Sequence, residues 1–159
     1  MNIKTNNFNI REIEERDINK NFINSLNNKE LNKFLSTGKK KQKKKDALNY
    51  FNCRKKNNDI YLIVFNKKRL IGTITYKKYQ KSSLFLGYAV LNQSYIGNDL
   101  FFKAVKTSIR YILKKYHVKK IFAGTNKNNI ASGFFLLKLG FVIKGRTTKF
   151  FRFIFRNRK

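Results

Sequence analysis

Asn129 and Ser132 are the side chains whose types and spacing most suggest chemistry: an amide and, three positions later, a hydroxyl that can donate or accept a hydrogen bond. Both also have ordinary structural roles, because Asn caps helices and a first-turn hydroxyl commonly bonds to nearby backbone. Apolar residues follow at helical spacing, and Gly140 stands where a left-handed helix end belongs. The local pattern therefore predicts a short helix followed by a strand, and by itself it indicates no function.

The cysteine and histidine content argues against a structural metal or an internal disulfide. A single Cys53 and a single His117 cannot form a zinc site of the usual kinds, and one cysteine cannot form an internal disulfide. His117 is expected to be a surface or packing residue. The lone cysteine favours a reducing compartment, so we expect a cytoplasmic protein. The polar first residues show no secretory signal, and no apolar run is long enough for a transmembrane segment.

The charge of the chain is extreme, since 37 Lys and Arg against 8 Asp and Glu give a formal net charge of +29. Two explanations stay open. A basic surface can serve an acidic partner such as nucleic acid, the ribosome, an anionic membrane or a phosphorylated substrate. Alternatively, the composition reflects drift towards Lys and Asn, with weak polyanion binding as a by-product. The run Lys39–Lys45 is expected to be a solvated loop.

The elements around these residues predict one α/β unit. With 159 residues, 42% of them hydrophobic, the chain can build one core, and it has no repeat and no Pro- or Gly-rich linker. Asp17 is expected to cap the first helix. The expected strands are residues 8–13, 60–65, 70–79, 84–91, 119–125, 141–147 and 150–155, and the expected helices are residues 18–26, 29–35, 46–55 and 99–116 and the short helix before Gly140, with a basic loop at 36–45.

Two strings resemble one known family. Asn129-x-x-Ser132 followed by LGF at 139–141 resembles the "N-x-x-S … K-L-G-F" segment of the GCN5-related N-acetyltransferases (GNAT), most of all the RimJ/RimL-like branch, whose members acetylate ribosomal proteins. Residues 69–74, RLIGTI, resemble the "hIGTI" strand of that branch. The resemblance covers nearly the whole chain. It implies a single GNAT domain over residues 1–159, of class α+β with α/β/α layers, a mixed sheet of about six to seven strands with a splayed fourth and fifth strand, and about four helices.

In that family acetyl-CoA lies between the splayed strands, which here are Leu86–Leu91 and Lys119–Thr125. The resemblance implies that the cofactor is held by Ala89, Val90, Leu91, Ile96, Gly97, Asn98, Asp99, Leu100, Asn129 and Ser132, with the diphosphate at a helix N-terminus, and it implies no metal. Asp99 departs from the family, which has a second glycine there. Its carboxylate is expected either to repel the diphosphate or to serve only as a helix cap, and Lys103 and Lys106 could take over binding.

Amide formation needs a free amine and a proton for the leaving thiolate. The resemblance makes Ser132 the candidate proton donor and Tyr88 a further acid–base candidate, with local bonding and packing as the competing roles. Phe85 replaces the branch's strand glutamate, and Ser25 replaces its tryptophan on the acceptor side.

The expected activity is transfer of acetyl to a primary amine of a protein N-terminus or of an amino sugar or other small molecule, by a monomer or homodimer. The alternative is a catalytically weakened GNAT-like module that binds CoA or a polyanionic partner such as the ribosome or nucleic acid.

Overall fold

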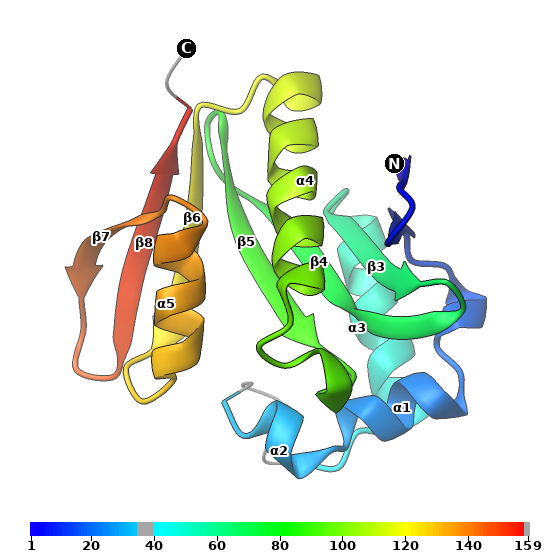
Figure 1. Cartoon of the computed structure of the whole chain (residues 1–159). Helices are drawn as coiled ribbons and strands as arrows, with labels where there is room; N and C mark the ends of the chain where they lie inside the picture. Colours follow the sequence, from blue (N-terminus) through cyan, green and yellow to red (C-terminus); the bar gives the residue numbers. More distant parts are fainter. Residues whose placement is uncertain (35–39, 158–159) are drawn as a thin grey trace.

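An eight-stranded sheet forms the centre of the fold in the computed structural model, which describes residues 1–34 and 40–157 (Figure 1). The strands are β1 (Asn2–Lys4), β2 (Asn9–Glu12), β3 (Ile60–Asn66), β4 (Arg69–Gln80), β5 (Ser83–Val90), β6 (Lys120–Asn126), β7 (Val142–Arg146) and β8 (Phe150–Arg156), in the spatial order β1-β2-β3-β4-β5-β6-β8-β7. All neighbouring pairs are antiparallel except β5 and β6, which run parallel. The sheet therefore has a single parallel junction.

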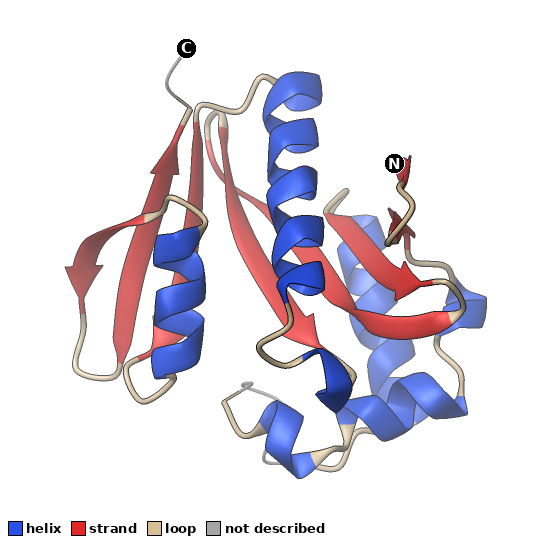
Figure 2. Ribbon diagram, viewed as in Figure 1, coloured by secondary structure: helices blue, strands red, loops and turns tan. Residues whose placement is uncertain are grey.

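Helices cover both faces of this sheet (Figure 2). They are α1 (Lys20–Leu26), α2 (Lys29–Asn32), α3 (Lys44–Lys56), α4 (Asp99–Tyr116) and α5 (Ile130–Lys138), with short 3₁₀ helices η1 (Glu15–Asp17) and η2 (Gln93–Tyr95). One buried cluster joins α4 and α5 to Leu86 of β5, and a second joins α1 and α3 to Ile63 of β3 and to Leu91. The α/β/α layering expected from the sequence is confirmed. Within the described ranges, no helix is long and apolar enough to cross a membrane.

The sheet is one strand wider than the six to seven strands expected. The extra strand, β1, pairs with β2 from Asn2↔Arg11 to Lys4↔Asn9. Its three residues contain only one apolar side chain, Ile3, so no hydrophobic alternation marks it in the sequence. The five α-helices, counted over the described residues, correspond to the five ranges that the residue pattern predicted and exceed by one the number of about four that the family resemblance implied. The additional elements are short and lie at the edges of the architecture, which is otherwise the predicted one.

The first helix starts at an asparagine and not at the predicted aspartate. The Phe22 N–H donates to Asn19 Oδ1 at 3.1 Å, so Asn19 is the cap and α1 begins at Lys20. The prediction that Asp17 caps this helix was therefore wrong. Asp17 lies in η1, where both of its carboxylate oxygens accept hydrogen bonds from Arg11 at 2.7 Å. Because Arg11, in the preceding strand, binds this carboxylate, Asp17 does not cap α1.

The basic loop expected at residues 36–45 is shorter than predicted at its far end. Lys44 and Lys45 belong to α3, because the Lys43 N–H donates to the Asp46 carboxylate at 2.9 Å and the helix starts two residues earlier than expected. At its near end, α2 stops at Asn32. Residues 40–43 form no helix or strand, as expected for the loop, and residues 33–34 form a turn where the helix was expected to continue. Residues 36–39 of the predicted loop and residue 35 of the predicted helix lie outside the described residues.

The two helices that flank the parallel junction form where the sequence predicted them. α4 covers the expected range, and α5 is followed by Gly140 with a φ of 92°, the left-handed conformation that favours glycine. On α5, however, Ile130 and Phe134 are 66% and 68% exposed, and Leu136 is the residue that enters the core. Apolar spacing predicted the helix, and the packing of the sheet decided which of its sides is buried.

Gly72 of β4 gives a test of how closely α4 packs on the sheet. A methyl group at this position would lie 2.3 Å from the Ala89 carbonyl oxygen and 2.8 Å from the Phe101 ring. Because backbone and a buried ring cannot move away cheaply, we expect Gly72→Ala to lower the free energy of unfolding by about 2 kcal/mol or more. Gly87→Ala is the matched control, since its methyl group would approach only Thr75, at 4.0 Å. Urea denaturation measures the free energy of unfolding of both variants. An equal loss in Gly72→Ala and Gly87→Ala would contradict this packing.

Candidate functional site

The sheet opens between β5 and β6. The two strands pair only from Ser83↔Lys120 to Leu86↔Ala123, although both continue beyond these residues. β5 remains bonded to β4 as far as Val90, and β6 remains bonded to β8 as far as Asn126. The divergence therefore leaves the facing edge of β5 without a strand partner from Gly87 onwards. Backbone groups along such an edge can bind a ligand that runs beside the strand.

The register decides which residues of β5 direct their backbone into this opening. The Leu91 N–H donates to the Ile71 carbonyl of β4 at 2.8 Å. Successive residues of a strand direct their backbone N–H and C=O groups to opposite sides. The backbone groups of Ala89 and Leu91 therefore face β4, and those of Tyr88 and Val90 face the opening. Of the three residues expected to pair with the pantetheine, Ala89, Val90 and Leu91, only Val90 thus has its backbone on the open side. Ala89 and Leu91 present theirs to β4.

Ser132 and Tyr88 meet beside this opening. The Tyr88 phenol and the Ser132 hydroxyl are 2.7 Å apart, and the phenol also lies 3.3 Å from the Ser132 carbonyl oxygen. Tyr88 comes from β5 and Ser132 from the first turn of α5, so the pair links the two sides of the opening. The structure thus brings the two candidate acid–base residues, which are 44 positions apart in the sequence, into one hydrogen-bonded pair.

Aromatic packing fixes the phenol of Tyr88. Its ring centroid lies 4.8 Å from that of Phe135 on α5 and 6.4 Å from that of Phe101 on α4. Burial among these rings raises the pKa of Tyr88 to about 12, and the hydrogen bond with Ser132 opposes part of that rise. The phenol is therefore neutral at physiological pH and can donate a proton to Ser132, whose own hydroxyl then remains free to donate elsewhere.

Asn129 positions Ser132 through the backbone. The Ser132 N–H donates to Asn129 Oδ1 at 3.1 Å, which makes Asn129 the cap of α5. The structural role expected for this asparagine is confirmed. No carboxylate supports the pair, because the eight acidic residues all lie at or before position 99, and none belongs to β5, β6 or α5. Phe85, which stands where a strand carboxylate was expected, instead lies beside the ring of Tyr79, with centroids 5.9 Å apart.

The N-terminus of α4 lies at the end of β5 and is built to receive an anion. Gly97 has a φ of 73°, and apart from its chain neighbours no described heavy atom would lie within 4 Å of a Cβ atom built on it. The Leu100 N–H donates to Asn98 Oδ1 at 2.8 Å, so Asn98 is the cap of this helix and occupies one first-turn donor. The other first-turn N–H groups have no partner in a preceding turn, and the helix dipole gives this end a partial positive charge.

Asp99 is neither the cap nor an unpaired charge. Its carboxylate accepts a hydrogen bond from Lys138 Nζ at 3.1 Å, and this ion pair joins the start of α4 to the end of α5. The hydrogen bond and charge of Lys138 hold the pKa of Asp99 below its usual value. The prediction that Asp99 caps the helix was wrong, and the expected repulsion between its charge and a diphosphate stays a prediction. Sequence reasoning missed Lys138, because 39 positions separate it from its partner.

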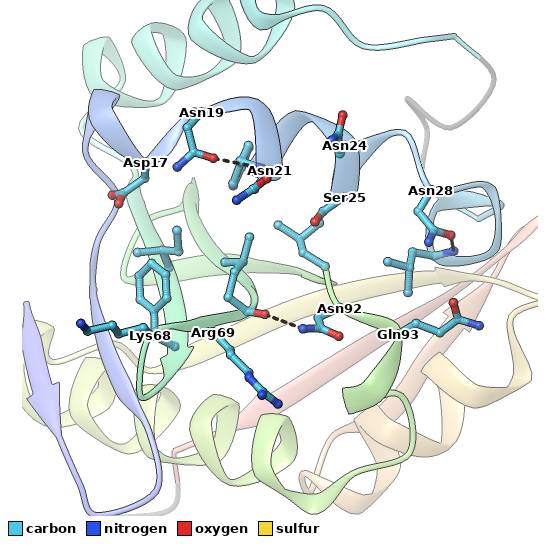
Figure 3. A pocket seen from close by; sticks show the side chains of 16 residues that line it. Asp17, Asn19, Asn21, Asn24, Ser25, Asn28, Lys68, Arg69, Asn92 and Gln93 are labelled. Carbon is cyan, nitrogen blue, oxygen red and sulfur yellow. Dashed lines mark hydrogen bonds between the residues drawn. The ribbon is translucent and has the colours of Figure 1, made fainter.

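A cavity of about 600 Å³ lies between α1 and the end of the sheet that α1 covers (Figure 3). Residues of α1 and α2 line one side, and the β3–β4 turn and the residues after β5 line the other. Leu91 is part of the lining, one residue beyond Val90. The cavity and the opening therefore meet at the end of β5. Ser25, whose type departs from the family on the acceptor side, also lines this cavity.

Comparisons with known proteins agree on one family. A family model described as an acetyltransferase (GNAT) domain matches residues 7–142. The [ribosomal protein uS5]-alanine N-acetyltransferase of Escherichia coli is 31% identical over 83 residues, which are 50% of this chain and 42% of the relative. The matched stretch thus spans less than half of that relative.

Solved structures share the fold at low sequence identity. RimL, the ribosomal L7/L12 α-N-protein acetyltransferase, in complex with coenzyme A, has a TM-score of 0.84 at 11% identity, with 98% of each chain covered. Spermidine N-acetyltransferase from Vibrio cholerae, in complex with CoA and spermine, has a TM-score of 0.81 at 16% identity, with 96% of each chain covered. At these identities the likeness shows the fold alone.

Titration of Tyr88 tests the geometry of the pair. We expect this phenol to ionise near pH 12 instead of 10, as read from the difference in tyrosinate absorbance between the native protein and Tyr88→Phe. Ser132→Ala should raise this pKa further, because the hydrogen bond to Ser132 lowers it. A raised folded-state pKa means that the contribution of Tyr88 to stability is complete below pH 10 and is lost as the pH rises through 12. Ionisation near pH 10, unchanged in Ser132→Ala, would show that the two hydroxyls are not paired.

Proposed function

The chain belongs to the acetyltransferase (GNAT) family, and from this membership we propose that it transfers the acetyl group of acetyl-CoA to a primary amine, as one domain over residues 1–159. The observation that carries the proposal is the family match over residues 7–142, which includes both strands of the opening and both residues of the Ser132–Tyr88 pair. The family resemblance leaves a protein N-terminus or a small amine as the acceptor. The basic surface would add weak contact with a polyanion such as the ribosome.

The described residues fit acetyl-CoA at two places. The open edge of β5 offers the N–H and C=O of Val90 to an extended pantetheine chain, next to Tyr88. The loop Ile96–Leu100 offers the positive end of α4 and an unobstructed approach at Gly97 to a diphosphate. Asn129 and Ser132 would border the pantetheine from α5. When bound here, the co-substrate supplies the activated acetyl group, and the chain supplies its orientation and the proton.

Ser132 is proposed to protonate the sulfur that leaves when the C–S bond breaks. Its hydroxyl is half-buried beside the opening, and Tyr88, 2.7 Å away, can return a proton to it. A hydroxyl alone is a weak acid, so the paired phenol gives the serine a defined hydrogen-bond direction and a proton source. The amine has no carboxylate base on β5, β6 or α5 to accept its proton. We therefore propose that the amine arrives neutral, that its nitrogen releases a proton to water once the C–N bond has formed, and that Tyr88 regains its proton from water.

Binding of CoA can be tested at Gly97 with two variants that differ only in charge. Asn and Asp both tolerate a positive φ better than other side chains do, so Gly97→Asn and Gly97→Asp should fold alike. We expect Gly97→Asp to weaken CoA binding far more than Gly97→Asn, because only the aspartate sets a negative charge against the diphosphate. Isothermal titration calorimetry at low salt measures both. Equal CoA affinities of the two variants, or no binding by the native protein at millimolar CoA, would show that the diphosphate does not bind at this loop.

Activity measurements can distinguish catalytic from structural roles of Ser132 and Tyr88. We expect Ser132→Ala to lower kcat by about 100-fold, the low end for a positioned general acid, with a smaller effect on KM for acetyl-CoA. Ser132→Cys should recover part of the loss because it keeps a donor. Tyr88→Phe should also lower kcat, whereas Tyr79→Phe, an exposed tyrosine 52% accessible to solvent, should not. Unchanged kcat in Ser132→Ala would assign Ser132 a structural role. Tight CoA binding without acetyl transfer would favour a binding module.

The Asp99–Lys138 pair makes a third prediction about CoA. Asp99→Asn keeps the size of the side chain and frees Lys138 for the diphosphate, so we expect it to tighten CoA binding about two- to fivefold, the scale of an exposed ion pair. Lys138→Gln should weaken binding by a similar factor. The double variant should resemble Lys138→Gln, because Asp99 acts through the lysine. Additive effects of the two substitutions would show that the aspartate acts on CoA directly.

A further inference from the structure

One half of the sheet has helices on a single face only. The buried clusters lie on opposite faces, because Leu62 of β3 joins the cluster of α4 and α5 and its neighbour Ile63 joins the cluster of α1 and α3. The first cluster reaches Ile121 of β6 and Phe153 of β8, whereas the second, within the described ranges, includes no residue of β6, β7 or β8. Figure 1 shows the same arrangement, with α5 over β6 and β8 and with α3 behind β3 and β4.

The strand register identifies the side chains on the face without a helix. Phe122 follows Ile121 in β6 and therefore points away from α4 and α5. Phe122 pairs with Phe85 of β5 and with Ile154 of β8, and Ile154 pairs with Val142 of β7. Paired residues point to the same face, so these four apolar side chains form one row across four strands. We call this face, on β5, β6, β8 and β7, the open face.

Cationic residues lie on both sides of the apolar row. On one side, Lys120 and Arg156 pair with each other across β6 and β8. On the other side, Arg152 pairs with Gly124 of β6 and with Gly145 of β7, so neither neighbouring strand places a side chain beside it. All three cations are exposed. These two cationic rows each lie two residues from the apolar row, or about 7 Å along the strands.

The stability of the sheet does not explain these charges. Lys120 and Arg156 are like charges on directly opposed residues, which destabilises a sheet. Among the described residues, none of the three exposed cations forms an ion pair, and the sequence has no acidic residue beyond Asp99. Long side chains can shield an apolar row with their stems, but residues of mixed sign would do so without repulsion. A surplus of one charge is typical of a surface that binds an anion.

An exposed tyrosine ring lies against the apolar row. Tyr79, near the end of β4, is 52% exposed, and its ring centroid lies 4.9 Å from that of Phe122 and 5.9 Å from that of Phe85. Lys144 also lies on Phe122, with its Nζ 5.2 Å from the centre of the ring. The tyrosine ring is therefore held by other rings and still reaches solvent. Such a ring beside cations can stack on a nucleobase.

A second exposed ring lies at the far end of the open face. Phe150 is 49% exposed and, two residues from Arg152 in β8, points to the same face. From Arg156 to Phe150 the strand spans six residues, or about 20 Å. That length matches about six stacked nucleotides at roughly 3.4 Å each.

We propose that the open face binds single-stranded nucleic acid, with bases stacked on Tyr79 and Phe150 and phosphates bound by the cationic rows. A duplex fits less well, because its bases are stacked on one another and cannot reach the rings. A second copy of the chain also fits less well, because two faces of like charge repel each other. The inference goes beyond acetyl transfer and does not depend on it, since the open face includes neither Ser132 nor the N-terminus of α4.

Binding to a single strand is compared with binding to a duplex. The probes are a fluorescent oligodeoxythymidylate of about 12 nucleotides, twice the span of the face, and the same strand paired with its complement. In fluorescence anisotropy at about 150 mM salt, we expect the full chain to bind the single strand at least about tenfold more tightly. Diffuse surface charge predicts the reverse, because the duplex has the higher charge density. Equal or tighter duplex binding, or no binding of the single strand, would overturn the proposal.

Two pairs of variants locate the strand. Tyr79→Ser should weaken single-strand binding by about tenfold, the scale of one stacked base, whereas Phe134→Ser, which removes a 68% exposed ring from α5, should not. Arg152→Gln leaves the apolar row intact and should lower the slope of log affinity against log salt by about one. Arg110→Gln, on α4, removes the same charge from the other face and should leave that slope unchanged.

The remaining outcomes would assign the open face or the strand differently. Equal effects within each pair of variants would show that binding follows net charge alone, and the proposal would fail. Displacement of the strand by CoA would place it at the N-terminus of α4 and would also overturn the proposal. Self-association of the free chain that is lost in Tyr79→Ser, as measured by sedimentation velocity, would assign the open face to a second copy. Acetyl transfer to a free amine is measured separately, so its absence would leave these results intact.

Discussion

The backbone of β5 carries a constraint on which the rest of the site depends. Its β4 side is fully paired, whereas its β6 side is paired only as far as Leu86. Unpaired strand backbone is costly when it is cut off from water and from other partners. Rings from α4 and α5 pack around Tyr88, the second residue of β5 beyond the last pair with β6. The helices thus contact the strand where its edge is open.

The same packing creates the polar pair. Phe135 and Ser132 lie three positions apart on α5, so one face of that helix presents both a ring and a hydroxyl to Tyr88. The ring contact positions the Tyr88 phenol, and the Ser132 hydroxyl is its hydrogen-bond partner. Burial that raises the pKa of the phenol also keeps it protonated, which a proton donor requires. Packing, hydrogen bonding and acid–base character are therefore set by one set of contacts.

The few acidic residues and the many basic residues have different surroundings in the structure. Asp17, Asp59 and Asp99 each pair with a single arginine or lysine within the fold. Carboxylates in this chain thus stabilise local structure, and most cations remain on the surface.

Residue patterns alone determined the order of the main elements, the amphipathic α4, the cap at Asn129 and the left-handed turn at Gly140, because each depends on neighbours within a few positions. The α/β/α layers were predicted from the family resemblance. They also located the family, through the spacing of Asn129, Ser132 and the residues that follow. Tertiary structure decided the rest. It chose Asn19 over Asp17 as a cap, turned Ile130 and Phe134 outward, directed the Val90 backbone to the open edge, and paired Ser132 with Tyr88 and Asp99 with Lys138. Those outcomes depend on which distant segments meet, and local spacing carries no information about contacts between residues 39 or 44 positions apart.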